Sequence, residues 1–149
     1  MKTIKVLETN ITETNIYEVS KTLNFSSNNR VAICNANTLV RSVKNLEIRN
    51  LINSFTIKTP DGFPVAKALS FLTKKNFARV DGYKVFLQTI SDGLETNKKH
   101  YFFGNNKKTT QQMIEKLKKM YPNIKISGFI CPEHMSAEEL SLQYKNEFE

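Results

Sequence analysis

Strand-like runs alternate with helix-like segments along this chain of 149 residues. Val31–Cys34 is a short continuous apolar run, which is typical of a strand buried on both faces of a parallel sheet. Ser54–Lys58 alternates apolar and polar side chains, as a half-buried strand does. Tyr101–Gly104 and Ile124–Ile126 are the next predicted strands, and helical patterns separate them. The sequence therefore predicts an α/β, Rossmann-like fold with a largely parallel sheet and helices on both faces.

Weaker signals predict the elements around these strands. Ile4–Leu7 fits an opening strand, and a helix is expected after a cap near Thr14 and Asn15. The apolar positions between Leu39 and Ile52 fit one broken helix or two. Turns are expected at Ala78–Gly82 and Ser91–Gly93. A helix is expected to be capped at Thr109 and Thr110 and to end at Pro122, and the strand that follows is expected to end at Gly128. A capped last helix is expected after Ser136.

One strand-to-helix junction, Thr59–Val65, contains the candidate catalytic residue. The apolar positions that follow it have the spacing of one helix face, and Pro64 suits a first helical turn because its missing N–H is not needed there. In open α/β sheets, ligands bind just beyond the carboxyl ends of the strands. Asp61 is the carboxylate that such a junction would direct into a pocket.

An ordinary turn is the alternative explanation for Asp61. Pro-Asp-Gly is a common turn sequence, since proline fixes φ and glycine permits positive φ. All three aspartates of the chain, Asp61, Asp81 and Asp92, directly precede a glycine. Position after a strand is what distinguishes Asp61 from the other two.

Length, charge and cysteine content limit the class of protein. A chain of this length fits one domain, and its formal net charge of +8 favours an anionic partner. The lysines are scattered and no nucleic-acid motif is present, so nucleic acid is not the expected partner. Anionic lipid headgroups, a phosphorylated substrate or simply solvated helix faces account for the charge. Without a signal peptide or an apolar spanning segment, we expect a soluble cytoplasmic protein.

Other polar residues give weaker signals. Asn35 follows the buried strand and either contacts substrate or caps the next helix. His100 and His134 have no partner at a suggestive spacing and are interpreted as surface residues. Cys34 fits a small core hydrophobe, and Cys131 precedes a proline in a loop. The two cysteines form neither a metal motif nor a disulfide framework.

The order of several short motifs resembles the WecG/TagA/CpsF family of glycosyltransferases, glycosyltransferase family 26. The resemblance runs from about Val31 to Gly128. It comprises Asn35 after a strand, Thr59–Val65, Arg79-Val80-Asp81-Gly82, Tyr101–Gly104 and Tyr121–Gly128. Each motif is short, and their order and spacing together carry the resemblance.

This resemblance implies a reaction and a set of site residues. Such enzymes transfer N-acetylmannosamine or a related hexose from a UDP-sugar to a lipid-linked sugar diphosphate, with inversion, in teichoic acid, common antigen or capsule synthesis. Asp61 would be the general base. The matched motifs imply substrate contacts at Asn35, Gly62, Arg79, Gly82 and Gly104. No cofactor is implied, and contact with the inner face of the plasma membrane is expected.

Stabilisation of the leaving UDP is expected without a metal ion. The chain contains no Asp-x-Asp pair, which is the usual carboxylate seat for a divalent cation. Arginine or helix N-termini would then stabilise the departing diphosphate, with Arg79 the first candidate. The sequence therefore predicts a site without a metal.

The chain departs from the family pattern at three places. Ile33 stands where the family often has threonine. Lys84 stands two residues after the Arg-Val-x-Gly motif, where the family usually has an aspartate. The chain is expected to correspond to about the N-terminal two-thirds of the catalytic domain, as a single domain over 1–149. We therefore expect the isolated chain to have little activity and to self-associate. The alternative is an inactive nucleotide-sugar-binding or interaction protein of the same fold.

Overall fold

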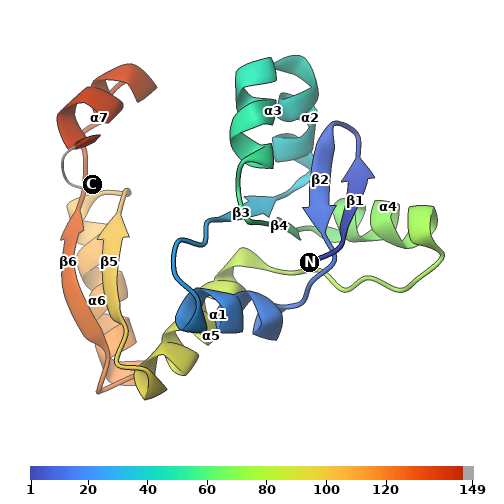
Figure 1. The fold of residues 1–149 in the computed structure, drawn as a ribbon. Helices are drawn as coiled ribbons and strands as arrows, with labels where there is room; N and C mark the ends of the chain where they lie inside the picture. Colours follow the sequence, from blue (N-terminus) through green and yellow to red (C-terminus); the bar gives the residue numbers. More distant parts are fainter. Residues whose placement is uncertain (146–149) are drawn as a thin grey trace. The chain divides into compact units, whose positions relative to one another are not determined.

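A computed structural model describes residues 1–145 of the chain (Figure 1). The chain divides into two compact units, Met1–Thr96 and a second unit that begins at Asn97. The first unit contains β1 (Thr3–Val6), β2 (Thr9–Thr12), α1 (Ile16–Phe25), β3 (Val31–Cys34), α2 (Ala36–Lys44), α3 (Leu46–Asn53), β4 (Ile57–Pro60), α4 (Phe63–Thr73) and α5 (Gly82–Glu95). The second contains β5 (Lys99–Phe103), α6 (Lys107–Met120), β6 (Lys125–Ile130) and α7 (Ala137–Tyr144).

Two parallel strand pairs confirm the predicted α/β class. β3 pairs with β4, and β5 pairs with β6, both in parallel. Each pair is connected through helices, as the alternating pattern predicted. In the described residues the strands form three separate two-stranded sheets, the third being the antiparallel pair of β1 and β2.

The sequence pattern did not predict strand β2. Its sequence, Thr-Asn-Ile-Thr, is mostly polar, yet Thr9, Ile11 and Thr12 are fully buried. Two hydrogen bonds explain how the threonines are accommodated: the Thr9 hydroxyl lies 2.8 Å from the Ser42 hydroxyl, and Lys58 N–H donates to Thr12 Oγ1 at 3.0 Å. Buried hydroxyl groups that are hydrogen-bonded in this way cost little stability.

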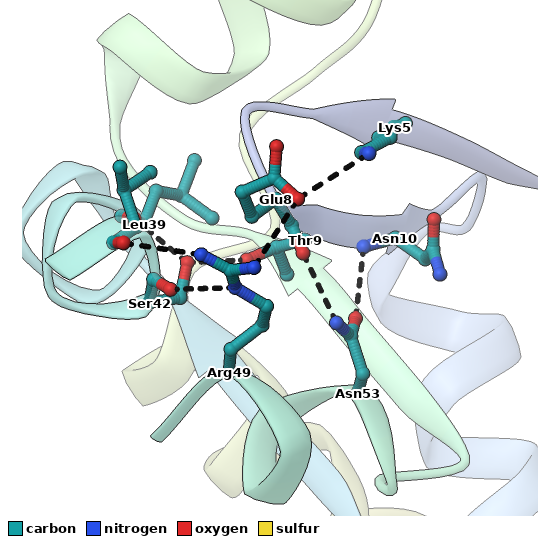
Figure 2. A network of polar contacts seen from close by, with 9 residues as sticks. Lys5, Glu8, Thr9, Asn10, Leu39, Ser42, Arg49 and Asn53 are labelled. Atoms are coloured by element: carbon teal, nitrogen blue, oxygen red, sulfur yellow. Dashed lines mark hydrogen bonds and ion pairs between the residues drawn. The ribbon is translucent and has the colours of Figure 1, made fainter. Parts of the chain in front are cut away.

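A polar network holds the β1–β2 hairpin against α2 and α3 (Figure 2). Arg49 Nε donates to Ser42 O at 3.0 Å and its terminal nitrogen donates to Val43 O at 3.1 Å, so the side chain satisfies carbonyls in the last turn of α2. The same guanidinium lies 3.6 Å from a carboxylate oxygen of Glu8 in the hairpin turn. Asn53 accepts from Asn10 N–H at 3.0 Å and donates to Glu8 O at 3.0 Å.

Helices α1 and α5 pack together beside β4. Val19, Ile57, Val80 and Val85 form the buried cluster between them. The expected turn at Ser91–Gly93 is wrong, because α5 continues to Glu95. Within the helix, Asp92 accepts from the Ser20 hydroxyl at 2.6 Å and from Gln88 at 2.7 Å. One bond comes from the preceding turn of α5 and the other from α1, and together they hold the Asp92 side chain within the helix.

The other hydrophobic cluster of the first unit joins the hairpin, α2, α3 and α4. Its buried members are Val6, Ile11, Cys34, Leu39, Ile52, Val65 and Leu69. Leu39 and Ile52 belong to two separate helices, which settles the open choice between one broken helix and two.

The second unit confirms most of its predicted elements and corrects two boundaries. α6 is capped by Asn106, whose side chain accepts from Thr109 N–H at 2.9 Å, rather than by Thr109 or Thr110. Gly128 lies inside β6 instead of ending it. A Cβ atom there would be 2.8 Å from the Tyr101 ring, so the glycine makes room for that ring. The capping box at Ser136 and Glu139 begins α7 as predicted.

No helix within residues 1–145 is both long enough and apolar enough to cross a membrane.

Candidate active site

Asn35 and Asp61 lie at the same edge of the β3–β4 pair. Cys34 is the register partner of Pro60, so the residue that follows each strand emerges at the same level. Asp61 N–H donates to Cys34 O at 3.0 Å, which continues the ladder one residue beyond β4. Both residues therefore lie at the carboxyl edge of a parallel strand pair.

Asn35 caps helix α2. Its side-chain oxygen accepts from Thr38 N–H at 3.0 Å and from the Thr38 hydroxyl at 3.2 Å. The capping alternative is therefore realised. The amide nitrogen of this exposed side chain is the group that can donate to a ligand.

Asp61 and Gly62 form a tight junction between β4 and α4. Gly62 has φ +81°, a backbone conformation that residues with a side chain rarely adopt, and this lets the chain turn directly into the helix. Because the N-cap residue Gly62 has no side chain, the first turn of α4 has no side-chain cap. Pro64 lies in this turn, as predicted. The Asp61 side chain retains 25% exposure. The carboxylate is thus accessible beside a helix N-terminus whose positive end favours anions.

Arg79 and Asp81 reach the same edge from the segment that precedes α5. Val80 N–H donates to Pro60 O at 3.0 Å and so holds this segment alongside β4. Arg79 Nε lies 3.9 Å from Asp61 Oδ1, and the other end of the guanidinium pairs with the Asp81 carboxylate. Arg79 therefore lies between two carboxylates while remaining half exposed.

Asp81 is a site residue that the sequence analysis missed. Its other carboxylate oxygen accepts from the N–H groups of Tyr83 at 2.9 Å and Lys84 at 3.2 Å, so it caps α5. An aspartate directly before an apolar helical pattern is an N-cap signal, and that signal could have distinguished it from a turn residue.

Gly82 fixes the approach of α5 to β3. A Cβ atom at this position would lie 3.2 Å from Ile33 Cγ2, so glycine allows the helix start to pack against the strand. The structure thus brings Asn35, Asp61, Gly62, Arg79 and Gly82 to one edge of the first unit.

Gly104 belongs to the second unit. It follows β5 with φ +113°, its N–H donates to Ile130 O at 2.9 Å, and its carbonyl accepts from the Thr110 hydroxyl at 3.4 Å. Its local role is to turn the chain from β5 toward α6.

The sequence did not predict the burial of Lys58 or the partial burial of His100. Lys58 is 5% exposed and donates to Phe55 O at 2.6 Å, near the end of α3, and burial lowers its pKa. His100 is half-buried, and burial likewise lowers its pKa, so its interpretation as a surface residue is wrong. Both residues lie in strands, and the local sequence of a strand does not show which of its polar side chains other elements will bury.

Cys34 matches its interpretation as a small core residue. Cys34 is fully buried, and burial raises the pKa of its thiol to about 11, with Lys58 acting in the opposite direction. A thiol with such a pKa stays protonated at neutral pH and is a poor nucleophile. Cys131 Sγ donates to the Thr110 hydroxyl at 3.4 Å.

No metal-binding cluster is formed by the described part of the chain. Groups of three or more histidine, cysteine or acidic side chains that could hold an ion do not occur within residues 1–145. The groups described at the candidate site are the Asp61 and Asp81 carboxylates, the Arg79 guanidinium and the N-termini of α2, α4 and α5.

Comparison with known proteins identifies the relatives of this chain. Residues 4–146 match the model of the Glycosyl transferase WecG/TagA/CpsF family. An N-acetylglucosaminyldiphosphoundecaprenol N-acetyl-beta-D-mannosaminyltransferase from Bacillus subtilis strain 168 is 22% identical over 99 residues, which are 66% of this chain and 39% of that protein. An enzyme of the same name from Bacillus spizizenii is 24% identical over 88 residues, 59% of this chain and 34% of that protein.

These matches span less than half the length of either relative. The family model, by contrast, covers nearly the whole chain and includes every residue of the candidate site. The chain belongs to the WecG/TagA/CpsF family of glycosyltransferases.

Proposed function

We propose that this chain forms part of a glycosyltransferase in which Asp61 is the general base. The donor is a UDP-sugar, with N-acetylmannosamine or a related hexose, and the acceptor is a lipid-linked sugar diphosphate. The relatives' name, which specifies an N-acetylmannosaminyl group and a diphosphoundecaprenol-linked acceptor, supports the transferred sugar and the acceptor. The observation that carries the proposal is the accessible Asp61 carboxylate at the carboxyl edge of β4, beside Asn35 and 3.9 Å from Arg79.

The reaction assigned to this site is a single inverting displacement. Asp61 accepts the proton of the acceptor hydroxyl as its oxygen forms a bond to the anomeric carbon of the donor. The bond from that carbon to UDP breaks on the opposite face, and its electron pair leaves with UDP. A general base of this kind contributes about 10²–10⁴-fold to the rate.

Stabilisation of the leaving diphosphate is assigned to Arg79 and the start of α4. Arginine matches phosphate oxygens with a fixed pair of donors, and the first turn of a helix offers unpaired N–H groups. Because Arg79 already lies beside Asp61 and Asp81, binding of a diphosphate would exchange one carboxylate partner for the ligand.

The first test measures UDP release. The chain is supplied at high concentration with UDP-N-acetylmannosamine and a lipid-linked N-acetylglucosamine diphosphate, and the low turnover expected of it should fall by a further factor of about 10²–10⁴ in Asp61→Asn. Glu115→Gln, an exposed acid-to-amide change on α6, is the matched control and should retain the parent rate. Unchanged turnover in Asp61→Asn would exclude Asp61 as the base.

The second test measures UDP binding by calorimetry with and without a chelator. Because the chain has no Asp-x-Asp pair and the described residues form no metal cluster, EDTA should leave the dissociation constant unchanged. Arg79→Ala should weaken binding about tenfold or more, since a charge-assisted contact is lost.

The two tests together separate the enzyme from the binding protein. Loss of affinity in EDTA that manganese restores would refute the metal-free site. UDP binding with no turnover in the parent chain, even at high protein concentration and long reaction times, would favour an inactive nucleotide-sugar-binding protein of the same fold.

A further inference from the structure

Helix α4 has apolar side chains on two faces. Val65, Ala66 and Leu69 point into the first unit and are at most 5% exposed. On another face, Phe63 is 68% exposed and Phe71 is 76% exposed. The two exposed rings leave apolar surface in water that a docking partner would remove.

Lysines interleave with these aromatic rings. Phe63, Lys67 and Phe71 follow one another at intervals of four residues, which places them on one helix face. The Lys67 ammonium lies 5.1 Å from the centre of the Phe63 ring, and that of Lys74 lies 5.5 Å from the centre of the Phe71 ring. We call this surface, made of Phe63, Lys67, Phe71 and Lys74, the α4 face.

The composition of the α4 face selects among possible occupants. A second copy of the face would bring its lysines against like charges, which is unfavourable when apolar surfaces close on one another. An anionic lipid surface matches both features, because rings enter the boundary between headgroups and acyl chains while ammonium groups stay with the phosphates. The net charge of the whole chain, +8, has the same sign.

We infer that the α4 face docks peripherally on an anionic lipid bilayer, with Phe63 and Phe71 inserted at the headgroup level and Lys67 and Lys74 paired with lipid phosphates. Each lysine near such a surface contributes about fivefold to binding, and burial of the two rings contributes about tenfold or more. This inference does not depend on the proposed reaction, because the binding involves neither donor nor acceptor.

The experiment is co-sedimentation of the 149-residue chain with vesicles. Vesicles containing about 30% phosphatidylglycerol are compared with pure phosphatidylcholine vesicles at low salt. The parent chain should bind the anionic vesicles and not the neutral ones, and binding should weaken as salt rises. Phe63→Ser with Phe71→Ser should lower the partition coefficient about tenfold or more, and Lys67→Gln with Lys74→Gln about 25-fold.

Helix α1 supplies a matched control. Lys21 and Phe25 are four residues apart and both exposed, like Lys67 and Phe71, but acidic Glu13 and Glu18 border the same recess. Lys21→Gln with Phe25→Ser should leave vesicle binding unchanged. Circular dichroism of every variant should match the parent, since all the replaced side chains are exposed.

Three results would overturn the inference. They are equal binding to neutral and anionic vesicles, vesicle binding that the α4-face variants do not lower, and equal loss in the α1 control. Concentration-dependent self-association that Phe63→Ser with Phe71→Ser abolishes, in a chain that does not bind vesicles, would assign the face to a second copy instead.

Discussion

Asp81 has two separable duties at the candidate site. One carboxylate oxygen caps α5 and the other pairs with Arg79. A cap is available to any residue with a short side-chain acceptor, whereas the pair needs a charge. Substitutions at this one position can therefore distinguish helix stability from control of Arg79.

We predict that Asp81→Ala lowers the free energy of unfolding by about 1 kcal/mol, whereas Asp81→Ser changes it by less than about 0.5 kcal/mol. Serine can still accept from the first-turn N–H groups, and alanine cannot. Urea denaturation followed by circular dichroism measures both. An equal loss in the two variants would show that the charge pair with Arg79, rather than the cap, holds the start of α5.

At the scale of elements, the β1–β2 hairpin depends on a buried pair of hydroxyl groups. Ser42 donates to Leu39 O at 2.7 Å, so the Thr9 hydroxyl is the donor in its 2.8 Å contact with Ser42. Both residues are fully buried. A hydroxyl left without its partner in such a place costs about 1–3 kcal/mol.

A double-mutant cycle tests this coupling. Ser42→Ala and Thr9→Val should each lower the free energy of unfolding by about 1–3 kcal/mol, and the double variant should cost about as much as one single change. Urea denaturation of the four proteins gives the coupling energy. Fully additive losses would mean that the two hydroxyls act independently.

Helical periods and the continuous apolar run of β3 predicted elements correctly. The alternation over Ser54–Lys58 started its strand three residues too early, because β4 is Ile57–Pro60 and all four of its residues are buried. Elements defined by polar burial were not predicted. β3 was predicted with its observed bounds, because four consecutive apolar or small residues leave few alternatives. β2 was missed because its threonines are satisfied by Ser42 and Lys58, which are far away in the sequence. Asp92 was assigned to a turn for the same reason, since its partner Ser20 is 72 residues away.

The candidate site was predictable in part. The adjacency of Asn35 and Asp61 follows from two parallel strands, and a sequence can show that. The contact between Arg79 and the Asp61 carboxylate depends on a backbone bond from Val80 to Pro60, which no local pattern specifies.

At the scale of the whole molecule, the hydrophobic core is unevenly divided. Both buried clusters belong to the first unit. Among the described residues from Asn97 on, Leu117 is the buried hydrophobic side chain. A segment of this size with so small a core is marginal by itself.

We therefore predict that the whole chain unfolds in one transition, as expected for a single domain, and that segment 97–149 is largely unfolded when produced alone. Circular dichroism and tyrosine fluorescence follow the unfolding of both parts, since each part contains tyrosines and the chain has no tryptophan. Two separate transitions, or a folded 97–149 segment, would instead establish two domains.

The bond from Asp61 N–H to Cys34 O joins the residue after β4 to the last residue of β3 through main-chain atoms alone. Every amino acid except proline can supply such a donor, and every amino acid can supply the acceptor. The strand side chains can therefore be exchanged widely while the carboxylate keeps its place. Sequence divergence to 22–24% identity is compatible with an unchanged main-chain position for the residue after β4 for this reason.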